Sequence, residues 1–187
     1  MALLSILLRK TVQLVGAVLC TLVYSTYSQA NLADTAELEQ KIAESQGQEK
    51  IALTIQYIKD GNRFSPDKSE SYAKSALTIV DDASPQKTVL LNYYALSKYH
   101  KSEFDQAEEI FQEALKRAKS SNNQQNMMLV YLSYSMQANE IKEHDKALKL
   151  TDTGLAIAEK INDLIFIPEL ITPIKTLDLP LGGKNHA

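Results

Sequence analysis

The chain has 187 residues, contains no tryptophan, and is poor in cysteine, glycine and proline. Six glycines and five prolines argue against a β-rich or low-complexity protein, and the single cysteine, Cys20, lies in the N-terminal segment. Hydrophobic residues make up 44% of the chain and charged residues 23%, which is the usual balance of a folded soluble protein. The length allows one domain with a core of its own.

The chain also lacks the residue patterns of common catalytic and metal sites. Its three histidines are too few and too scattered to form a metal site with ligand spacing. The acidic pairs Asp81-Asp82 and Glu108-Glu109 are expected on solvated helix surfaces, because adjacent side chains on a helix point to different sides. Gly182-Gly183 is not followed by the lysine of a phosphate-binding loop, and no serine or cysteine stands in a nucleophile motif. We therefore expect no enzyme activity, no cofactor and no metal.

Residues 1–30 have the pattern of a signal peptide. Arg9 and Lys10 precede the apolar run Val12–Tyr24, and Ser28-Gln29-Ala30 places small residues at the two positions that a signal peptidase reads. Cleavage is predicted between Ala30 and Asn31, which predicts a periplasmic or secreted protein. The alternative is an uncleaved membrane anchor within residues 1–30, because further apolar residues precede Arg9.

Cleavage would remove Cys20 and two positive charges, so the net charge would change from −3 to −5. A mature chain without thiols suits an oxidising compartment. A mildly acidic protein has no electrostatic reason to bind nucleic acid or anionic lipid. We expect neither as a partner, and no membrane insertion once the signal is removed.

Two segments of the chain, Thr88–Asn123 and Met128–Asp163, match each other at a distance of 40 residues. In a helical solenoid each unit buries its apolar face against its neighbours, and a fixed period of this size is typical of that architecture. The shared positions are Tyr94/Tyr134, Glu103/Glu143, Asp105/Asp145, Ala107/Ala147, Leu115/Leu155, Ala118/Ala158 and Asn122/Asn162.

The remaining segments are interpreted as flanks of these units. Ser65-Pro66-Asp67 predicts a helix start, with a serine N-cap, proline at the first helical position and an acid in the first turn. Pro168 and Pro173 interrupt an apolar C-terminal stretch, which reads as a capping helix or as the first helix of a unit without its partner. The predicted organisation is a capping helix at 31–47, repeats at about 48–83, 88–123 and 128–163, a C-terminal capping helix at 164–179 and a flexible tail at 180–187.

These residues resemble the tetratricopeptide repeat family. The resemblance is strongest in the middle unit, where Leu91, Tyr94 and Ala95 match the first helix of the family pattern and Phe104, Ala107, Phe111 and Ala114 match the second. In the third unit Thr151 and Gly154 replace the aromatic residue and the alanine. The family repeat has about 34 residues. The longer period here is similar to that of the exported sensory segments of bacterial diguanylate cyclases and histidine kinases.

The resemblance implies an all-α fold, a short right-handed solenoid of about three helix-turn-helix units with capping helices. It also implies that a protein or peptide binds on the concave face. Two alternatives are a free-standing or truncated sensory input module with a membrane-bound signalling partner, and an accessory factor in envelope assembly. The residues that the resemblance places in the groove are Asn92, Leu96, Tyr99, Leu132, Met136 and Asn139.

Overall fold

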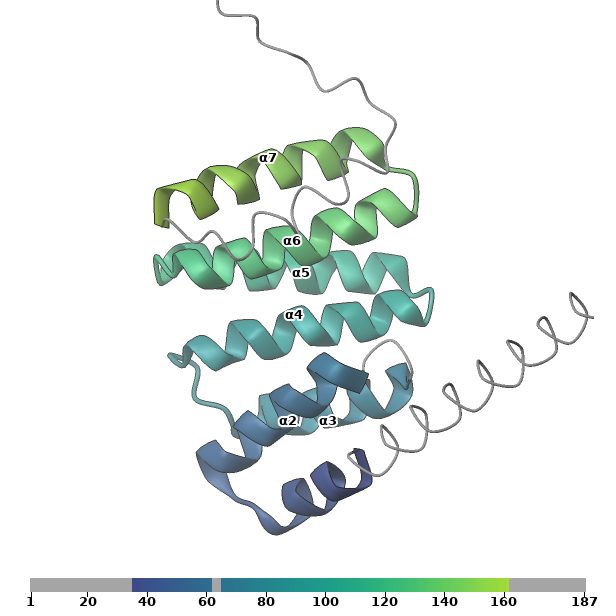
Figure 1. Ribbon diagram of the computed structural model, residues 1–187, viewed down its shortest axis with the longest axis vertical. Coiled ribbons are helices and arrows are strands. Elements are labelled where there is room, and N and C mark those ends of the chain that lie inside the picture. Colours follow the sequence, from purple (N-terminus) through teal and green to yellow (C-terminus); the bar gives the residue numbers. More distant parts are fainter. Residues whose placement is uncertain (1–34, 62–64, 162–187) are drawn as a thin grey trace, which may run out of the picture. The chain divides into compact units, whose positions relative to one another are not determined.

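The computed structural model describes residues 35–61 and 65–161, and all regular secondary structure in these ranges is α-helical (Figure 1). The predicted all-α fold class is thereby confirmed for the described part of the chain. The predicted signal peptide at 1–30, the capping helix at 164–179 and the tail at 180–187 lie outside the described residues. By its internal contacts the chain divides into two units, Met1–Glu44 and Ser45–Ala187.

In the first unit, residues 35–44 are helical and fall within the capping helix predicted at 31–47. Lys41 and Glu37 form an exposed ion pair of 2.6 Å across one turn of this helix. Gly47, which was expected to end this helix, is instead the first residue of the next one and has a φ of 54°. Residues with positive φ are disfavoured inside a helix, and glycine accepts this conformation without strain, so the break falls here.

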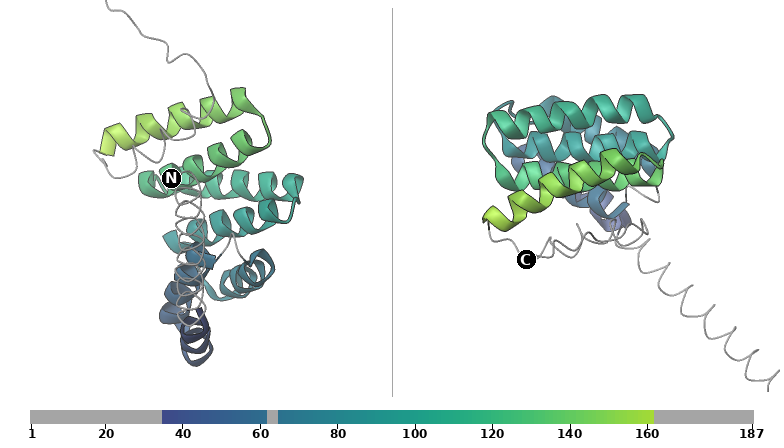
Figure 2. Two further views of the ribbon diagram at one scale, coloured as in Figure 1. Left: turned by 45° about the vertical axis from the view of Figure 1, so that its right-hand side comes forward. Right: turned by 90° about the horizontal axis from the view of Figure 1, so that it is seen from above.

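The second unit contains a succession of helices, each of which packs against the next along the chain. In addition, α4 packs against both α2 and α6, so the even-numbered helices also lie next to one another (Figures 1 and 2). The helices are α2 (Gly47–Gly61), α3 (Pro66–Ile79), α4 (Pro85–His100), α5 (Phe104–Ser120), α6 (Gln124–Glu140) and α7 (His144–Ile161).

Three helix starts carry an N-cap residue, and the one at Ser65 is the start that the sequence predicts. Ser65 is the N-cap of α3 and Pro66 occupies its first turn, although the Ser65 side chain makes no capping hydrogen bond. Ser84 caps α4 more completely, because its hydroxyl accepts a hydrogen bond of 3.3 Å from the backbone N–H of Gln86. Asn123 caps α6 in the same way with its side-chain oxygen. Such caps satisfy N–H groups that have no partner within the helix.

The turns inside the two matching segments have the same backbone geometry. Ser102 and Lys142, which are 40 residues apart, have positive φ values of 62° and 65°. After each of them a backbone N–H reaches back to the preceding helix, from Glu103 to the carbonyl of Lys98 and from Glu143 to that of Ala138. This is the bonding of a helix C-terminus closed by a left-handed residue. The repeat in the sequence is therefore also a repeat in the structure.

The core of the second unit combines small and aromatic side chains. Phe111 is 1% exposed and its ring stacks on that of Tyr134, with centroids 4.9 Å apart. Thr151, the equivalent of Phe111, is also buried and satisfies its hydroxyl by donating to the carbonyl of Ala147 at 2.9 Å. Gly154 is buried at the position that corresponds to Ala114. Small residues at these positions allow close helix packing. The repeat at 128–163 therefore packs like the repeat at 88–123, although two residue types differ.

Phe104 departs from the expected packing. It corresponds to an aromatic packing position in the family pattern, but 41% of the residue is exposed. Its ring touches that of Tyr99, with centroids 5.1 Å apart. Phe104 is the first residue of α5, where the side chain lies at the end of the helix pair and is covered on one side.

Candidate binding face on helices α4 and α6

Helices α4 and α6 lie side by side and run in the same direction. The side-chain amide of Asn126 donates to the carbonyl of Pro85 at 2.8 Å, and that of Asn92 donates to the hydroxyl of Ser133 at 3.1 Å. Both pairs are separated by 41 residues, so a residue of α4 lies beside the residue 41 positions later in α6. Because the offset is constant along both helices, they are parallel and in register.

Helix α6 has no polar face. It carries no charged residue before Glu140, and ten of its residues, from Asn126 to Ala138, are buried. Its packing partners among the described helices are α4, α5 and α7. Because uncharged side chains lie all round this helix, neighbouring helices can cover it on several sides. One of its large apolar residues, Met136, remains 42% exposed.

The structure places two of the six predicted groove residues inside the protein. Asn92 is fully buried and its amide is engaged by Ser133, between α4 and α6. Leu132 is also buried, where it packs with Met128 of α6 and Ala158 of α7. Neither side chain presents an accessible surface to a partner. Their roles in this structure are packing and the alignment of helices.

The other four predicted residues lie at accessible or half-buried positions. Leu96 packs against the core from α4 while remaining partly exposed, and Met136 occupies the equivalent place in α6. Tyr99 and Asn139 are half-buried one turn further along their helices. The in-register packing of α4 and α6 thus gives these four residues neighbouring places on two parallel helices.

Tyr99 and Asn139 make equivalent contacts with different chemistry. The ring of Tyr99 contacts that of Phe104 at a tilt, whereas the side-chain oxygen of Asn139 lies 3.2 Å from Nδ1 of His144. Burial raises the pKa of the Tyr99 hydroxyl to about 12, and the nearby Glu140 carboxylate adds to this effect. Tyr99 is therefore a neutral hydrogen-bonding group at physiological pH. Glu140 was not among the predicted residues, and a charge at the end of an apolar helix gave no specific signal.

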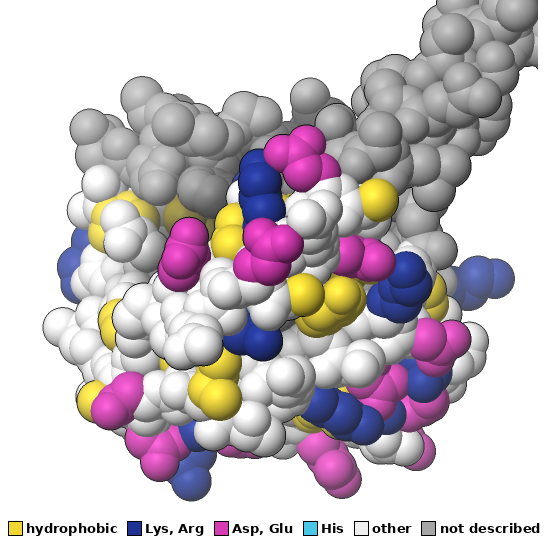
Figure 3. Space-filling model, turned by 90° about the horizontal axis from the view of Figure 1, so that it is seen from below, with side chains coloured by type: hydrophobic (Ala, Val, Ile, Leu, Met, Phe, Trp, Pro, Cys, Tyr) yellow, Lys and Arg dark blue, Asp and Glu magenta, His cyan; other side chains and the backbone are white. Residues whose placement is uncertain are grey.

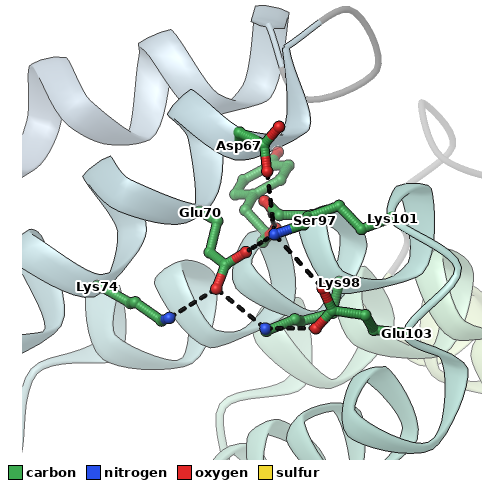
Figure 4. Close-up of polar contacts among 8 residues, drawn as sticks. Asp67, Glu70, Lys74, Ser97, Lys98, Lys101 and Glu103 are labelled. Carbon is green, nitrogen blue, oxygen red and sulfur yellow. Dashed lines mark hydrogen bonds and ion pairs between the residues drawn. The ribbon is translucent and has the colours of Figure 1, made fainter.

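An ion-pair cluster joins α3 to α4 and to the start of α5 (Figure 4). At its centre, Glu70 contacts Lys74, Lys98 and Lys101 at 2.6, 3.0 and 2.7 Å, and only 8% of the side chain of Glu70 or of Lys98 is exposed. Glu103 completes the pairing, with 2.6 Å to Lys98. Burial acts to raise the pKa of Glu70, but hydrogen bonds from the three lysines outweigh it and lower the pKa to about 2.

A smaller cluster occupies the corresponding place between α5, α6 and α7. The hydroxyl of Tyr134 donates to Glu108 at 2.7 Å, and Lys146 lies 2.7 Å from the other oxygen of the same carboxylate. The Lys146 ammonium also lies 4.8 Å from the centroid of the Tyr134 ring. The hydrogen bonds from Lys146 and Tyr134 lower the pKa of Glu108. In both clusters the charged groups are used to hold helices together, which is a structural role.

Two buried acceptors on α4 and α6 have no hydrogen-bond partner, namely Oδ1 of Asn92 and Oε1 of Gln137. Within residues 35–61 and 65–161, no helix is both long and apolar enough to cross a bilayer. In the same ranges no three histidine, cysteine or acidic side chains gather in a way that would hold a metal ion. On the face drawn in Figure 3, acidic and basic side chains are interspersed and small hydrophobic patches lie between them.

No protein-family model matches the chain, and searches of curated proteins and of solved structures returned no significant match.

Proposed function

We propose that the chain is a helical-repeat protein of the tetratricopeptide type that binds a protein or peptide along α4 and α6, without chemistry of its own. The main support is the parallel, in-register packing of these two helices. It repeats the same face at a fixed interval, which suits the capture of an extended chain. The repeated turns at Ser102 and Lys142 and the contacts of α4 with α2 and α6 agree with a solenoid arrangement.

The residues that we assign to this face are Leu96, Tyr99, Met136 and Asn139. Leu96 and Met136 offer apolar surface, and a 42% exposed methionine on a largely buried helix is a flexible contact for an apolar side chain. Tyr99 and Asn139 can donate and accept hydrogen bonds at the same end of the two helices. Such a mixture of apolar and amphipathic groups is typical of the central part of a protein interface.

Site-specific photocrosslinking in cells tests this assignment. A photoreactive residue at position 136 of the full chain is expected to capture a partner, and the same residue at the exposed position 152 of α7 serves as the control. Tyr99→Ala should reduce the yield of the adduct at position 136 without unfolding the protein. Equal capture at both positions, or none at position 136, would contradict a binding face on α4 and α6.

We also propose that the protein is exported before it binds its partner, with cleavage near Ala30-Asn31. The support is the signal-like pattern of residues 1–30. N-terminal sequencing of the protein recovered from the cell envelope is expected to start near Asn31. A start at Met1 in a membrane fraction would favour the anchored alternative, and recovery from the cytoplasm would contradict export.

A further inference from the structure

The strongest feature that the proposed function leaves unused is an open groove of about 540 Å³ in the second unit. It lies where the α3–α4 connection and the first turn of α4 meet the C-terminal half of α5. None of the six predicted groove residues lines it. Its volume falls within the range that is usual for small-molecule sites.

Thr88 contributes a hydroxyl to the wall of this groove. The residue is only 3% exposed and lines the groove from α4. A hydroxyl at the wall of the groove can donate a hydrogen bond to a bound molecule and accept one from it.

Arg117 holds the two walls of the groove together. Its guanidinium donates to the backbone carbonyl of Asp82 and lies 3.7 Å from the Asp82 carboxylate, which also pairs with Lys87. These contacts fix Arg117 across the groove while further N–H groups of the guanidinium remain for a ligand, since arginine has five. The α3–α4 connection and α5 are thereby joined at the site.

Glu113 and Lys116 add an anion and a cation to the α5 wall. They are exposed, lie one helical turn apart, and neither forms an ion pair with another described residue. A simple anion in this groove would meet Glu113 and Asp82, and a simple cation would meet Lys116 and Arg117. A molecule that carries one positive and one negative charge can pair with the acidic and the basic side chains of the groove at once. Charge complementarity therefore favours a zwitterion.

We propose that this groove binds a small zwitterion of the α-amino acid class. The ligand carboxylate pairs with Lys116 and Arg117, the ligand ammonium pairs with Glu113, and the hydroxyl of Thr88 hydrogen-bonds the bound molecule. This site goes beyond the proposed peptide-binding face and does not depend on it. It uses other residues, and its test requires no protein partner.

Calorimetry and thermal unfolding of the full chain test the site with glycine and then with each of the other common amino acids, up to 10-fold above the apparent dissociation constant. At least one is expected to bind saturably and to raise the unfolding temperature, as any ligand of the native state does. Acetate and ethylammonium, which carry one charge each, are the matched probes and should bind at least roughly tenfold more weakly. Binding of acetate as tightly as the amino acid would contradict a zwitterion site, and so would the absence of binding by every amino acid.

Four variants locate the binding. Glu113→Gln and Lys116→Gln should each weaken it by roughly tenfold, as expected for the loss of an ion pair in a partly solvated site. Thr88→Val, which removes the hydroxyl and keeps the branched shape of the side chain, should also weaken binding. Glu109→Gln, on the same helix but outside the groove, is the control. Unchanged binding in Glu113→Gln and Lys116→Gln would overturn the assignment.

Discussion

The side-chain amide of Asn92 donates a hydrogen bond to the hydroxyl of Ser133 across the interface of α4 and α6, with 3.1 Å between Nδ2 and Oγ. Both residues are buried, and Oδ1 of Asn92 has no partner. The sequence repeat is 40 residues, yet this contact joins positions 41 residues apart. Asn92 therefore contacts Ser133, which follows its repeat equivalent Leu132, because side chains of adjacent helices interdigitate.

Breaking this hydrogen bond is expected to destabilise the protein. Ser133→Ala removes the acceptor and leaves the buried amide of Asn92 without a partner, at a cost of about 1–3 kcal/mol in the free energy of unfolding. In an Asn92→Leu background the same Ser133→Ala change should cost less, because no amide remains to be stranded. Urea denaturation of the four proteins of this double-mutant cycle measures the coupling. Additive effects would show that the contact does not link the two helices.

Glu70 should make stability dependent on acid pH. Its folded-state pKa is lowered from 4.5 to about 2, so its contribution is complete above pH 4.5 and is lost as the pH falls towards 2. The contribution of a side chain this well buried is on the order of 3 kcal/mol. Glu70→Gln should lower stability at pH 7 and flatten the decline between pH 4.5 and 2, measured by denaturant unfolding at each pH.

Glu109→Gln is the control for this measurement, since Glu109 is an exposed residue on α5. It should leave both the stability and its pH dependence close to those of the unmodified protein. An acid decline that is just as steep in Glu70→Gln would show that the cluster in Figure 4 does not hold α3 to α4 through this carboxylate.

Two phenylalanines of α5 should differ strongly in their contribution to stability. Phe111→Ala removes a ring that is 1% exposed and stacked on Tyr134, and it should cost about 3–5 kcal/mol. Phe104→Ala removes a ring that is 41% exposed and should cost about 1 kcal/mol or less. Chemical denaturation of both variants is the measurement. Similar losses would contradict the burial of Phe111 or the exposure of Phe104.

Glycine at the left-handed turn positions should stabilise the protein. Lys142 has a φ of 65°, a conformation that costs an L-residue with a side chain about 1–2 kcal/mol. Part of this gain is offset by the greater freedom of glycine in the unfolded chain, so Lys142→Gly should raise the free energy of unfolding by up to about 1 kcal/mol. Lys149→Gly within α7 is the contrast and should lower it by about 1 kcal/mol. Destabilisation of equal size in both variants would argue against a left-handed turn at Lys142.

Much of the local structure could be predicted from the sequence. Ser65-Pro66 marks a helix start because the serine can cap free N–H groups and proline fixes the backbone angle of the first turn. Ser84-Pro85 has the same pattern at the start of α4, three residues before the start predicted at Thr88. The matching alanines, such as Ala107 and Ala147, indicate close helix contacts and are buried in both matching segments. These features depend on neighbours in the sequence, so local chemistry is sufficient to predict them.

The candidate binding face was harder to predict. Asn92 and Leu132 were assigned to it with Leu96 and Met136, but successive residues on a helix point about 100° apart, and small differences in orientation decide burial. The sequence of helix α6 does not indicate which of its sides faces solvent, because it lacks a distinct polar face. The groove beside Thr88 was not predicted at all, since it is formed by two segments that only folding brings together.

The sequence by itself determined that the described chain is helical, where its helices begin and turn, and that two segments repeat the same plan. These properties follow from capping groups, left-handed turn positions and the spacing of small and apolar residues, all of which act within a few residues. Tertiary structure alone decided the 41-residue register of α4 and α6, the burial of Asn92 and the groove around Thr88. Each of these depends on which helices become neighbours, and that choice is made by packing across the whole unit.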